Sequence, residues 1–311
     1  MTTMPDSLRD LARAQGGVLL ASQAATQGID EHGLQRLAGH LHHVRRNAYA
    51  LAPVWATATP EGRLALQTRA ILLDRPGSVA SHQSALALHG LPLHGVPMGV
   101  DVLAFVGRTR VRRSVRAHPF PAGVDAVDLH GFAAVPAAWA IAQVLARHGR
   151  NAGLVPLDRA LHDGVITADE AEAALAAQPL GPRRRLRLGQ FVRSADPRCE
   201  SVGETLTRLL LVDLGYAVQT QVEFSDDRGM PWARVDFLVA GRVIVEFDGL
   251  AKYAGPEGRE ALAAEKQRED RLRSLGYAVV RITWRDLDRP AWIADQIRSA
   301  LVRTVARQPA A

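Results

Sequence analysis

The chain has 311 residues, too many for one ordinary compact domain and enough for two or three. Its formal charge of +6 at pH 7 permits a nucleic-acid partner without requiring one. The single cysteine, Cys199, excludes a disulfide framework and a thiolate zinc site and suits a reducing compartment. No apolar run approaches the roughly 20 residues that span a bilayer, and residues 1–10 lack signal-peptide features. We therefore expect a cytoplasmic protein with no membrane partner.

The first region, residues 1–55, has the pattern of a winged helix-turn-helix. Capping residues and glycines predict three short helices within residues 5–39, and residues 41–51 read as two strands joined by a turn. In that arrangement the third helix enters a major groove and the wing contacts phosphates. The side chains expected to contact DNA are His32, Gln35, Arg36, Arg45 and Arg46. A small helical domain that only packs on its neighbours explains the pattern equally well.

Residues 60–185 predict a middle α+β domain, in which helices flank a small sheet. His82 and His89 lie on one face of an expected helix, but spacing places no third ligand, which favours core histidines over a metal site. The arginines at 108–116 suit either a phosphate backbone or a solvated strand face. The Gly-Pro-Arg-Arg-Arg run at 181–185 is typical of a linker.

The last region, residues 196–307, predicts the element order α-β-β-β-α-β-α. The motif Leu-Gly-Tyr-Ala-Val occurs at 214–218 and again at 275–279, each time where a helix pattern closes on glycine before a strand. Two more strands and a polar helix lie between the two copies. The whole chain is thus expected to be a multidomain protein of α/β and α+β class.

The hairpin at 233–248 gathers acidic side chains on one face. Because side chains alternate along a strand, a three-residue turn at 240–242 sets Asp236 opposite Glu246 and places Asp248 on the same face. The opposite face is then apolar throughout: Val235, Phe237, Val239, Val243, Val245 and Phe247. A two-residue turn would bury an unpaired carboxylate, so the apolar pattern favours the register that gathers the acids.

Carboxylates gathered in this way repel one another unless a cation lies among them. A hard ion such as Mg²⁺ or Mn²⁺ suits oxygen ligands, and it can activate a water molecule and neutralise a phosphodiester under attack. A nearby amine would assist, and the only two lysines of the chain follow the hairpin. The candidate metal ligands are Asp236, Glu246 and Asp248, and the wider catalytic set adds Glu204, Lys252 and Lys266. Glu200 shares a helix face with Glu204, so either glutamate could complete the site. Taken singly, each of these residues also fits a solvated surface or an ion pair along a helix.

Four stretches carry a joint pattern: Glu200-Ser201-x-x-Glu204-Thr205, Arg234-Val235-Asp236-Phe237, Val245-Glu246-Phe247-Asp248-Gly249 with Lys252-Tyr253, and Glu265-Lys266-x-Arg268-Glu269-Asp270-x-Leu272-Arg273. Together they resemble the PD-(D/E)xK nuclease superfamily, especially the DUF559 group, which is related to very-short-patch repair endonucleases. The resemblance implies that Asp236 and Glu246 take the metal-binding acid positions. Asp248 stands where the superfamily usually has lysine, and the resemblance leaves Lys252 or Lys266 to supply the displaced amine.

The first half carries a second resemblance, through Tyr49-Ala50-Leu51 and the run Ser-His-x-Ser-Ala-x-x-x-His-Gly-Leu at 81–91. These residues resemble proteins with an AbiEi-type antitoxin N-terminal domain. That family implies a winged helix that binds a promoter within a type IV toxin–antitoxin operon, and hence a cognate toxin as a protein partner.

Two functions follow from these patterns. The first is a metal-dependent DNA endonuclease that an N-terminal DNA-binding domain delivers to its substrate. The alternative is a non-catalytic transcriptional regulator of antitoxin type, in which the nuclease-like region serves as a binding module. An RNA substrate is compatible with the same active-site chemistry.

Overall fold

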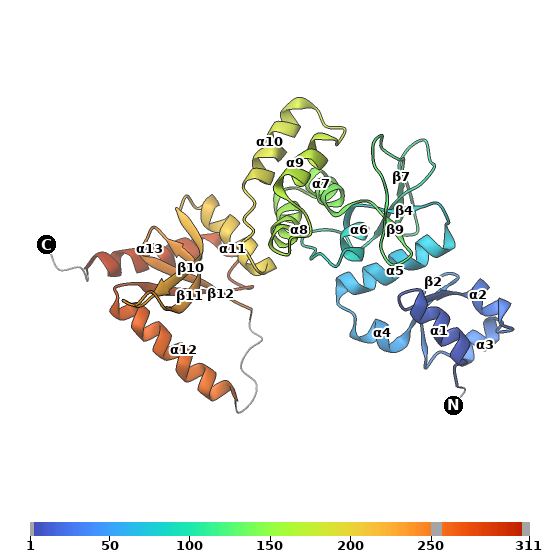
Figure 1. Ribbon diagram of the computed structural model, residues 1–311, viewed down its shortest axis with the longest axis horizontal. Coiled ribbons are helices and arrows are strands. Elements are labelled where there is room, and N and C mark those ends of the chain that lie inside the picture. The colour runs from blue at the N-terminus through green and yellow to red at the C-terminus, as the bar shows by residue number, and fades with distance from the viewer. Residues whose placement is uncertain (1–2, 250–256, 307–311) are drawn as a thin grey trace. The chain divides into compact units, whose positions relative to one another are not determined.

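The computed structural model describes residues 3–249 and 257–306, with side chains at 3–249 and 264–304. Within that part the protein is mixed α/β, with thirteen helices and three sheets, as the predicted fold class requires at this level. The chain divides into two compact units, Met1–Ala195 and Asp196–Ala311 (Figure 1). None of the described helices is both long enough and apolar enough to cross a membrane.

The first unit begins with short helices around a three-stranded sheet. Its elements are α1 (Asp6–Ala14), β1 (Val18–Leu20), α2 (Ala21–Thr26), α3 (Glu31–Arg36), β2 (Leu41–Arg45) and β3 (Ala48–Leu51). The strands are antiparallel in the order β1-β3-β2, so the predicted hairpin gains a third strand that was too short to be signalled by alternation. Asp30 caps α3 by accepting a hydrogen bond from the Gly33 amide at 2.7 Å, as expected of an N-cap aspartate.

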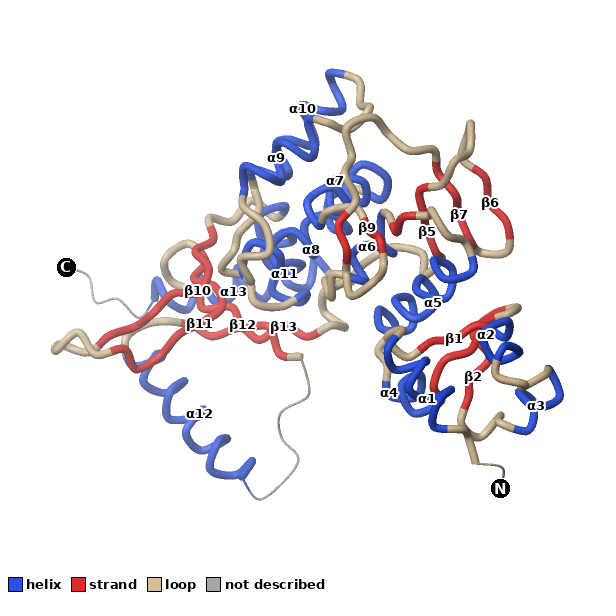
Figure 2. Tube along the Cα trace, turned by 45° about the vertical axis from the view of Figure 1, so that its right-hand side comes forward, coloured by secondary structure: helices blue, strands red, loops and turns tan. Residues whose placement is uncertain are grey.

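A six-stranded sheet follows in the same unit, in the order β6-β7-β5-β4-β9-β8 (Figure 2). The elements are α4 (Ala52–Thr57), α5 (Pro60–Asp74), β4 (Val79–Ala80), α6 (His82–Leu88), β5 (Val100–Leu103), β6 (Arg110–Arg112), β7 (Val115–His118), β8 (Val127–Asp128) and β9 (Ala133–Ala134). Leu66 of α5 packs against Val18 and Ala50 of the first sheet. Buried residues from the two predicted regions, 1–55 and 60–185, therefore pack together in one hydrophobic cluster.

Four helices complete the first unit: α7 (Ala137–His148), α8 (Arg150–His162), α9 (Ala168–Ala176) and α10 (Pro182–Arg193). The interpretation of residues 181–185 as a linker is wrong, because Pro182 is the first residue of α10 and Gly181 is its N-cap. Proline suits the first position of a helix, where its missing amide hydrogen costs no hydrogen bond. Leu188 and Val192 are buried one turn apart, and α10 packs against α8 and α9.

The second unit has the predicted order of elements. They are α11 (Val202–Asp213), β10 (Val218–Ser225), β11 (Pro231–Val239), β12 (Val243–Asp248), α12 (Glu257–Ser274), β13 (Ala278–Thr283) and α13 (Pro290–Ala306). The sheet order is β10-β11-β12-β13, with β12 and β13 parallel and the other neighbours antiparallel. Helices α11 and α13 pack on one face of this sheet, and α12 packs on the other (Figure 1).

The predicted register of the β11–β12 hairpin is confirmed. Val239 pairs with Val243 and Phe237 pairs with Val245, which leaves a three-residue turn and carries Asp236 to the level of Glu246. One correction concerns Val235, which packs with the core on the α12 side instead of with the predicted apolar face. Thr220 pairs with Phe237 and Val222 with Val235 in one register, but Gln221 between them has a left-handed φ of 51°.

Gly203, in the first turn of α11, lies against the ring of Phe247. A Cβ atom at this glycine would stand 2.0 Å from Phe247 Cε1, which is far inside van der Waals contact. We expect Gly203→Ala to lower the stability of the second unit by about 1–3 kcal/mol, the usual cost of overpacking. Urea unfolding checks this, with Gly249→Ala as the control because a Cβ there meets nothing within 4 Å. Equal midpoints for the two variants would contradict the packing described.

Candidate functional site

Three of the predicted acids lie on three different elements of the second unit, where Glu204 and Glu246 both act electrostatically on Asp236. Glu204 lies on α11, Asp236 on β11 and Glu246 on β12, and all three side chains are half-buried. Asp236 Oδ2 accepts a hydrogen bond from the Phe247 amide at 2.8 Å, which fixes the carboxylate against the edge of β12. Burial raises the pKa of Asp236 to about 6, and the negative charges of Glu204 and Glu246 act in the same direction.

Two arginines neutralise part of this acidic cluster. Arg268 Nη2 of α12 donates to Glu246 Oε1 and to Glu265 Oε1, each at 2.7 Å. Arg281 of β13 pairs with Glu265 at 2.8 Å and with Glu269 at 2.9 Å, and its Nε lies 3.6 Å from Glu246. Arg273 also pairs with Glu269, so three glutamates share three guanidinium groups.

Arg268 is a residue to which the sequence patterns assigned no role. It stands three residues after Glu265 and four before the buried Leu272, so helical spacing turns it toward the sheet. Lys266 is instead exposed, about 100° around the helix from Glu265, and no contact joins it to the carboxylates among the described residues. Lys252 lies outside the described residues. The described cation beside Glu246 is thus a guanidinium, which can neutralise charge but does not release a proton.

In the described part of the chain, Glu204 and Asp236 accept hydrogen bonds from neutral donors only. Glu204 Oε1 accepts from Ser201 Oγ at 2.7 Å, and its Oε2 accepts from Gln221 Nε2 at 3.0 Å and from the Glu200 amide at 2.9 Å. Asp236 Oδ1 accepts no hydrogen bond from any described residue. Two half-buried carboxylates without a paired cation leave negative charge that no described cation neutralises through an ion pair.

Asp248 ends β12 and pairs in register with Thr283 of β13. Its side chain is half-buried. Asp248 therefore lies two residues after Glu246, at the carboxyl end of the interior strand β12. Of the six residues proposed for catalysis, Glu204, Asp236 and Glu246 are electrostatically coupled through Asp236, whereas Lys266 is not brought to them among the described residues.

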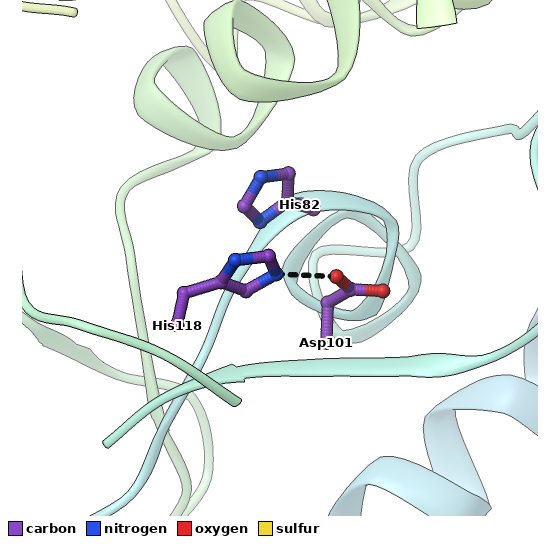
Figure 3. A group of neighbouring side chains, drawn as sticks. All are labelled: His82, Asp101 and His118. Atoms are coloured by element: carbon purple, nitrogen blue, oxygen red, sulfur yellow. Dashed lines mark hydrogen bonds and ion pairs between the residues drawn. The ribbon is translucent and has the colours of Figure 1, made fainter. Parts of the chain in front are cut away.

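A second polar group lies in the first unit, where Asp101 of β5 meets His82 and His118 (Figure 3). In the described part of the chain, these are the three residues whose ligand atoms lie within 4.8 Å of one another. His118 Nε2 lies 2.5 Å from Asp101 Oδ1, and the carboxylate is 1% exposed. The sequence patterns singled out His82 alone; the missed signal was an aspartate inside the apolar strand β5, which must be paired when it is buried.

The geometry of this group does not fit a metal ion. The His82 and His118 rings are stacked, with centroids 4.4 Å apart and an interplanar angle of 25°, so their in-plane nitrogen lone pairs do not converge. Two guanidinium groups also compensate Asp101 Oδ1, with Arg147 at 3.0 Å and Arg116 at 3.5 Å. A further cation would be repelled there. The group is a buried ion network that joins β5, β7 and α7.

His82 and His89 have different surroundings, although they share a helical segment. Burial lowers the pKa of His82 to about 3, and the neighbouring His118 acts in the same direction, so the ring is neutral near pH 7. His89 Nε2 lies 2.9 Å from the Val135 carbonyl oxygen. The half-buried His89 ring is thus held by a backbone hydrogen bond, and the two rings do not form one site.

The residues predicted to contact DNA differ in their exposure. His32, Gln35 and Arg36 are exposed on one face of α3, while Leu34 on the other face is buried. Arg46 is exposed, but Arg45 is half-buried and lines a cavity of the first unit. No protein family model and no curated protein matches this chain, so the functional assignment rests on these residues.

Proposed function

We propose that the second unit is a divalent-cation-dependent endonuclease that hydrolyses phosphodiester bonds in DNA, built on a restriction-endonuclease-like core. The observation that carries this proposal is the pair Glu204 and Asp236. Both carboxylates are half-buried without a paired cation in the described part of the chain, and burial raises the Asp236 pKa to about 6. Perturbed carboxylates of this kind cluster at functional sites more often than on structural surfaces.

The donor set suits Mg²⁺ or Mn²⁺. Glu204, Asp236 and Glu246 offer oxygen atoms, which hard cations prefer, and Asp236 Oδ1 accepts no hydrogen bond from a described residue. When bound, the ion would lower the pKa of a coordinated water and neutralise charge on the phosphodiester. Arg268 and Arg281 lie beside Glu246 and can pair with phosphate oxygens, because a guanidinium matches that geometry.

In this proposal the N-terminal region of the first unit is a winged helix that binds the DNA. The exposed His32, Gln35 and Arg36 would reach base edges, and Arg46 would contact a phosphate. The division of the first unit into a DNA-binding domain at 1–55 and a middle domain at 60–185 belongs to the same proposal.

A second candidate function is a DNA-binding regulator of antitoxin type without nuclease activity. It is favoured by the pairing of Glu246 with Arg268, which engages one of the proposed metal ligands, and by Asp248 at the position of the motif lysine. Such a regulator would bind its own promoter and a cognate toxin. It predicts a footprint there that Arg36→Ala and Arg46→Ala weaken, with no cleavage at any cation concentration.

Incubation of the full chain with supercoiled plasmid and Mg²⁺ or Mn²⁺ separates the two functions. We expect the wild type to nick or linearise the plasmid, and Asp236→Asn and Glu246→Gln to lose about 100-fold or more, since changes even around metal ligands cost up to that much. Glu223→Gln, at an exposed position, serves as a control that retains cleavage. A parallel cleavage assay with RNA shows which nucleic acid is the substrate. Equal products from the wild type and Asp236→Asn, or none on either substrate, would refute the nuclease.

A further inference from the structure

Three segments of the first unit surround a strongly basic cavity of about 650 Å³. They are the β2–β3 turn, the end of α5 and the β6–β7 turn. The lining residues are Arg45, Arg46, Asn47, Asp74, Arg75, Arg112 and Arg113. The one acid among them, Asp74, already accepts a hydrogen bond from Asn47 Nδ2 at 2.9 Å. The cavity therefore carries a large positive excess.

Arg45 is the member of this lining whose hydrogen bonding is incomplete. Its Nη1 atom is buried and has no hydrogen-bond partner. Burial lowers the Arg45 pKa, and the positive charges of Arg75 and Arg113 lower it further, while Asp74 acts in the opposite direction. Among the described residues, none of the five arginines forms an ion pair with a carboxylate within 4.0 Å. A buried guanidinium nitrogen in such surroundings lacks an anion.

The backbone at two of the three segments is held in an unusual conformation. Asn47 has a φ of 63°, and Arg113 and Ser114 have φ values of 49° and 62°. A turn with two consecutive left-handed residues usually takes asparagine and glycine, so an arginine at the first position is strained. Strain of this kind persists where the surrounding structure or a ligand fixes it. Here it places Arg113 at the cavity.

We propose that this cavity binds phosphate groups, with Arg45, Arg75, Arg112 and Arg113 as the principal ligands. The guanidinium fork matches phosphate oxygens in pairs, and several arginines exceed the need of a single phosphate. The ligand is therefore a diphosphate group or consecutive phosphates of a nucleic-acid backbone. The first would be a free nucleotide, and the second would extend the proposed DNA contacts of the wing. The proposed phosphate site does not depend on the proposed cation site of the second unit.

Thermal unfolding of the full chain with and without pyrophosphate tests the site. We expect pyrophosphate at millimolar concentration to raise the unfolding midpoint of the wild type and to leave Arg112→Ala/Arg113→Ala unmoved. Arg108→Ala/Arg110→Ala is the matched control, because it removes the same charge from exposed positions outside the cavity and should keep the shift. No shift in the wild type, or an equal loss in both double variants, would overturn the proposal.

Arg45→Met distinguishes binding from a structural role. Without an anion, removal of a guanidinium whose Nη1 is buried and unpartnered should raise the unfolding midpoint or leave it unchanged, and the pyrophosphate shift should disappear. A lowered midpoint combined with a retained shift would contradict the role of Arg45.

Duplex binding identifies the source of the phosphate. If the backbone of DNA occupies the cavity, Arg112→Ala/Arg113→Ala should weaken duplex binding and reduce the slope of log K against log salt by about 2, because each lost phosphate contact contributes about 0.9. If a free nucleotide occupies it, duplex binding should be unchanged while the pyrophosphate shift is lost. Either result supports a phosphate site, and plasmid cleavage in the same variants reports separately on the nuclease.

Discussion

Replacing Asp101 by alanine should lower the free energy of unfolding of the first unit by about 3–5 kcal/mol, the cost of removing one partner from a buried ion network. Asp101 is 1% exposed and lies 2.5 Å from His118 Nε2 and 3.0 Å from Arg147 Nη1. Its Oδ2 also accepts a hydrogen bond from Gln83 Nε2 at 2.5 Å. Without the carboxylate, these donors and the Arg116 guanidinium lose their acceptor, and their charges repel one another.

Urea unfolding measures this loss, with Asp125→Ala at an exposed position as the control. The pKa of Asp101 lies below its ordinary value: burial opposes this shift, but the hydrogen bond from His118 and the nearby positive charges outweigh burial. The stabilisation from a depressed carboxyl pKa is present above the unfolded pKa and is lost as the pH falls through the folded one. A loss below about 1 kcal/mol, within the range of ordinary surface substitutions, would show that the network contributes little.

Replacing Asp236 by asparagine should have the opposite effect on stability and abolish cleavage. The folded pKa of about 6 lies above the ordinary value of 3.8, so the stability that this carboxyl contributes is full below pH 3.8 and is lost as the pH rises through 6. At pH 8 the native state holds a desolvated anion that asparagine does not carry. The asparagine amide would be neutral, and its oxygen could still accept from the Phe247 amide, so we expect a gain of about 2 kcal/mol at pH 8 and none near pH 4.

Thermal or urea unfolding at the two pH values checks this prediction. Glu223→Gln, an exposed substitution of the same kind, should change stability at neither pH. Stability that rises when an ionisable group is removed, together with lost cleavage, is the expected trade-off at a functional site. A variant that is less stable at both pH values would instead give Asp236 a structural role.

The alternation of side chains along β11 and β12 was enough to predict part of the acid cluster from the sequence. The apolar residues of β11 and β12 fix the register, and the register carries Asp236 to the level of Glu246. The Arg268 guanidinium beside them was not predicted, because the scarcity of lysine directed the interpretation to Lys252 and Lys266. Which side chain of α12 meets the sheet depends on the rotation of that helix, and Leu272 sets this rotation so that Arg268 faces inward.

The ion network around Asp101 could not be predicted from local sequence patterns. Its partners stand 17 residues away at His118 and 46 residues away at Arg147, and they meet because β5 and β7 pair and α7 packs nearby. The basic cavity of the first unit could not be predicted for the same reason, since its lining comes from turns that only the tertiary fold brings together. Arg45 was expected on a free wing, yet the hydrogen bond between Asn47 and Asp74 ties that turn to the end of α5.

In the proposed nuclease, Glu204 and Asp236 hold a divalent cation. Titration of the full chain with Mn²⁺, followed by electron paramagnetic resonance of the free ion, measures it directly. We predict that the wild type binds Mn²⁺, that Asp236→Asn loses this binding, and that His82→Ala retains it because the stacked histidines do not fit a metal. Equal binding by the wild type and Asp236→Asn, or loss of binding in His82→Ala alone, would contradict the account.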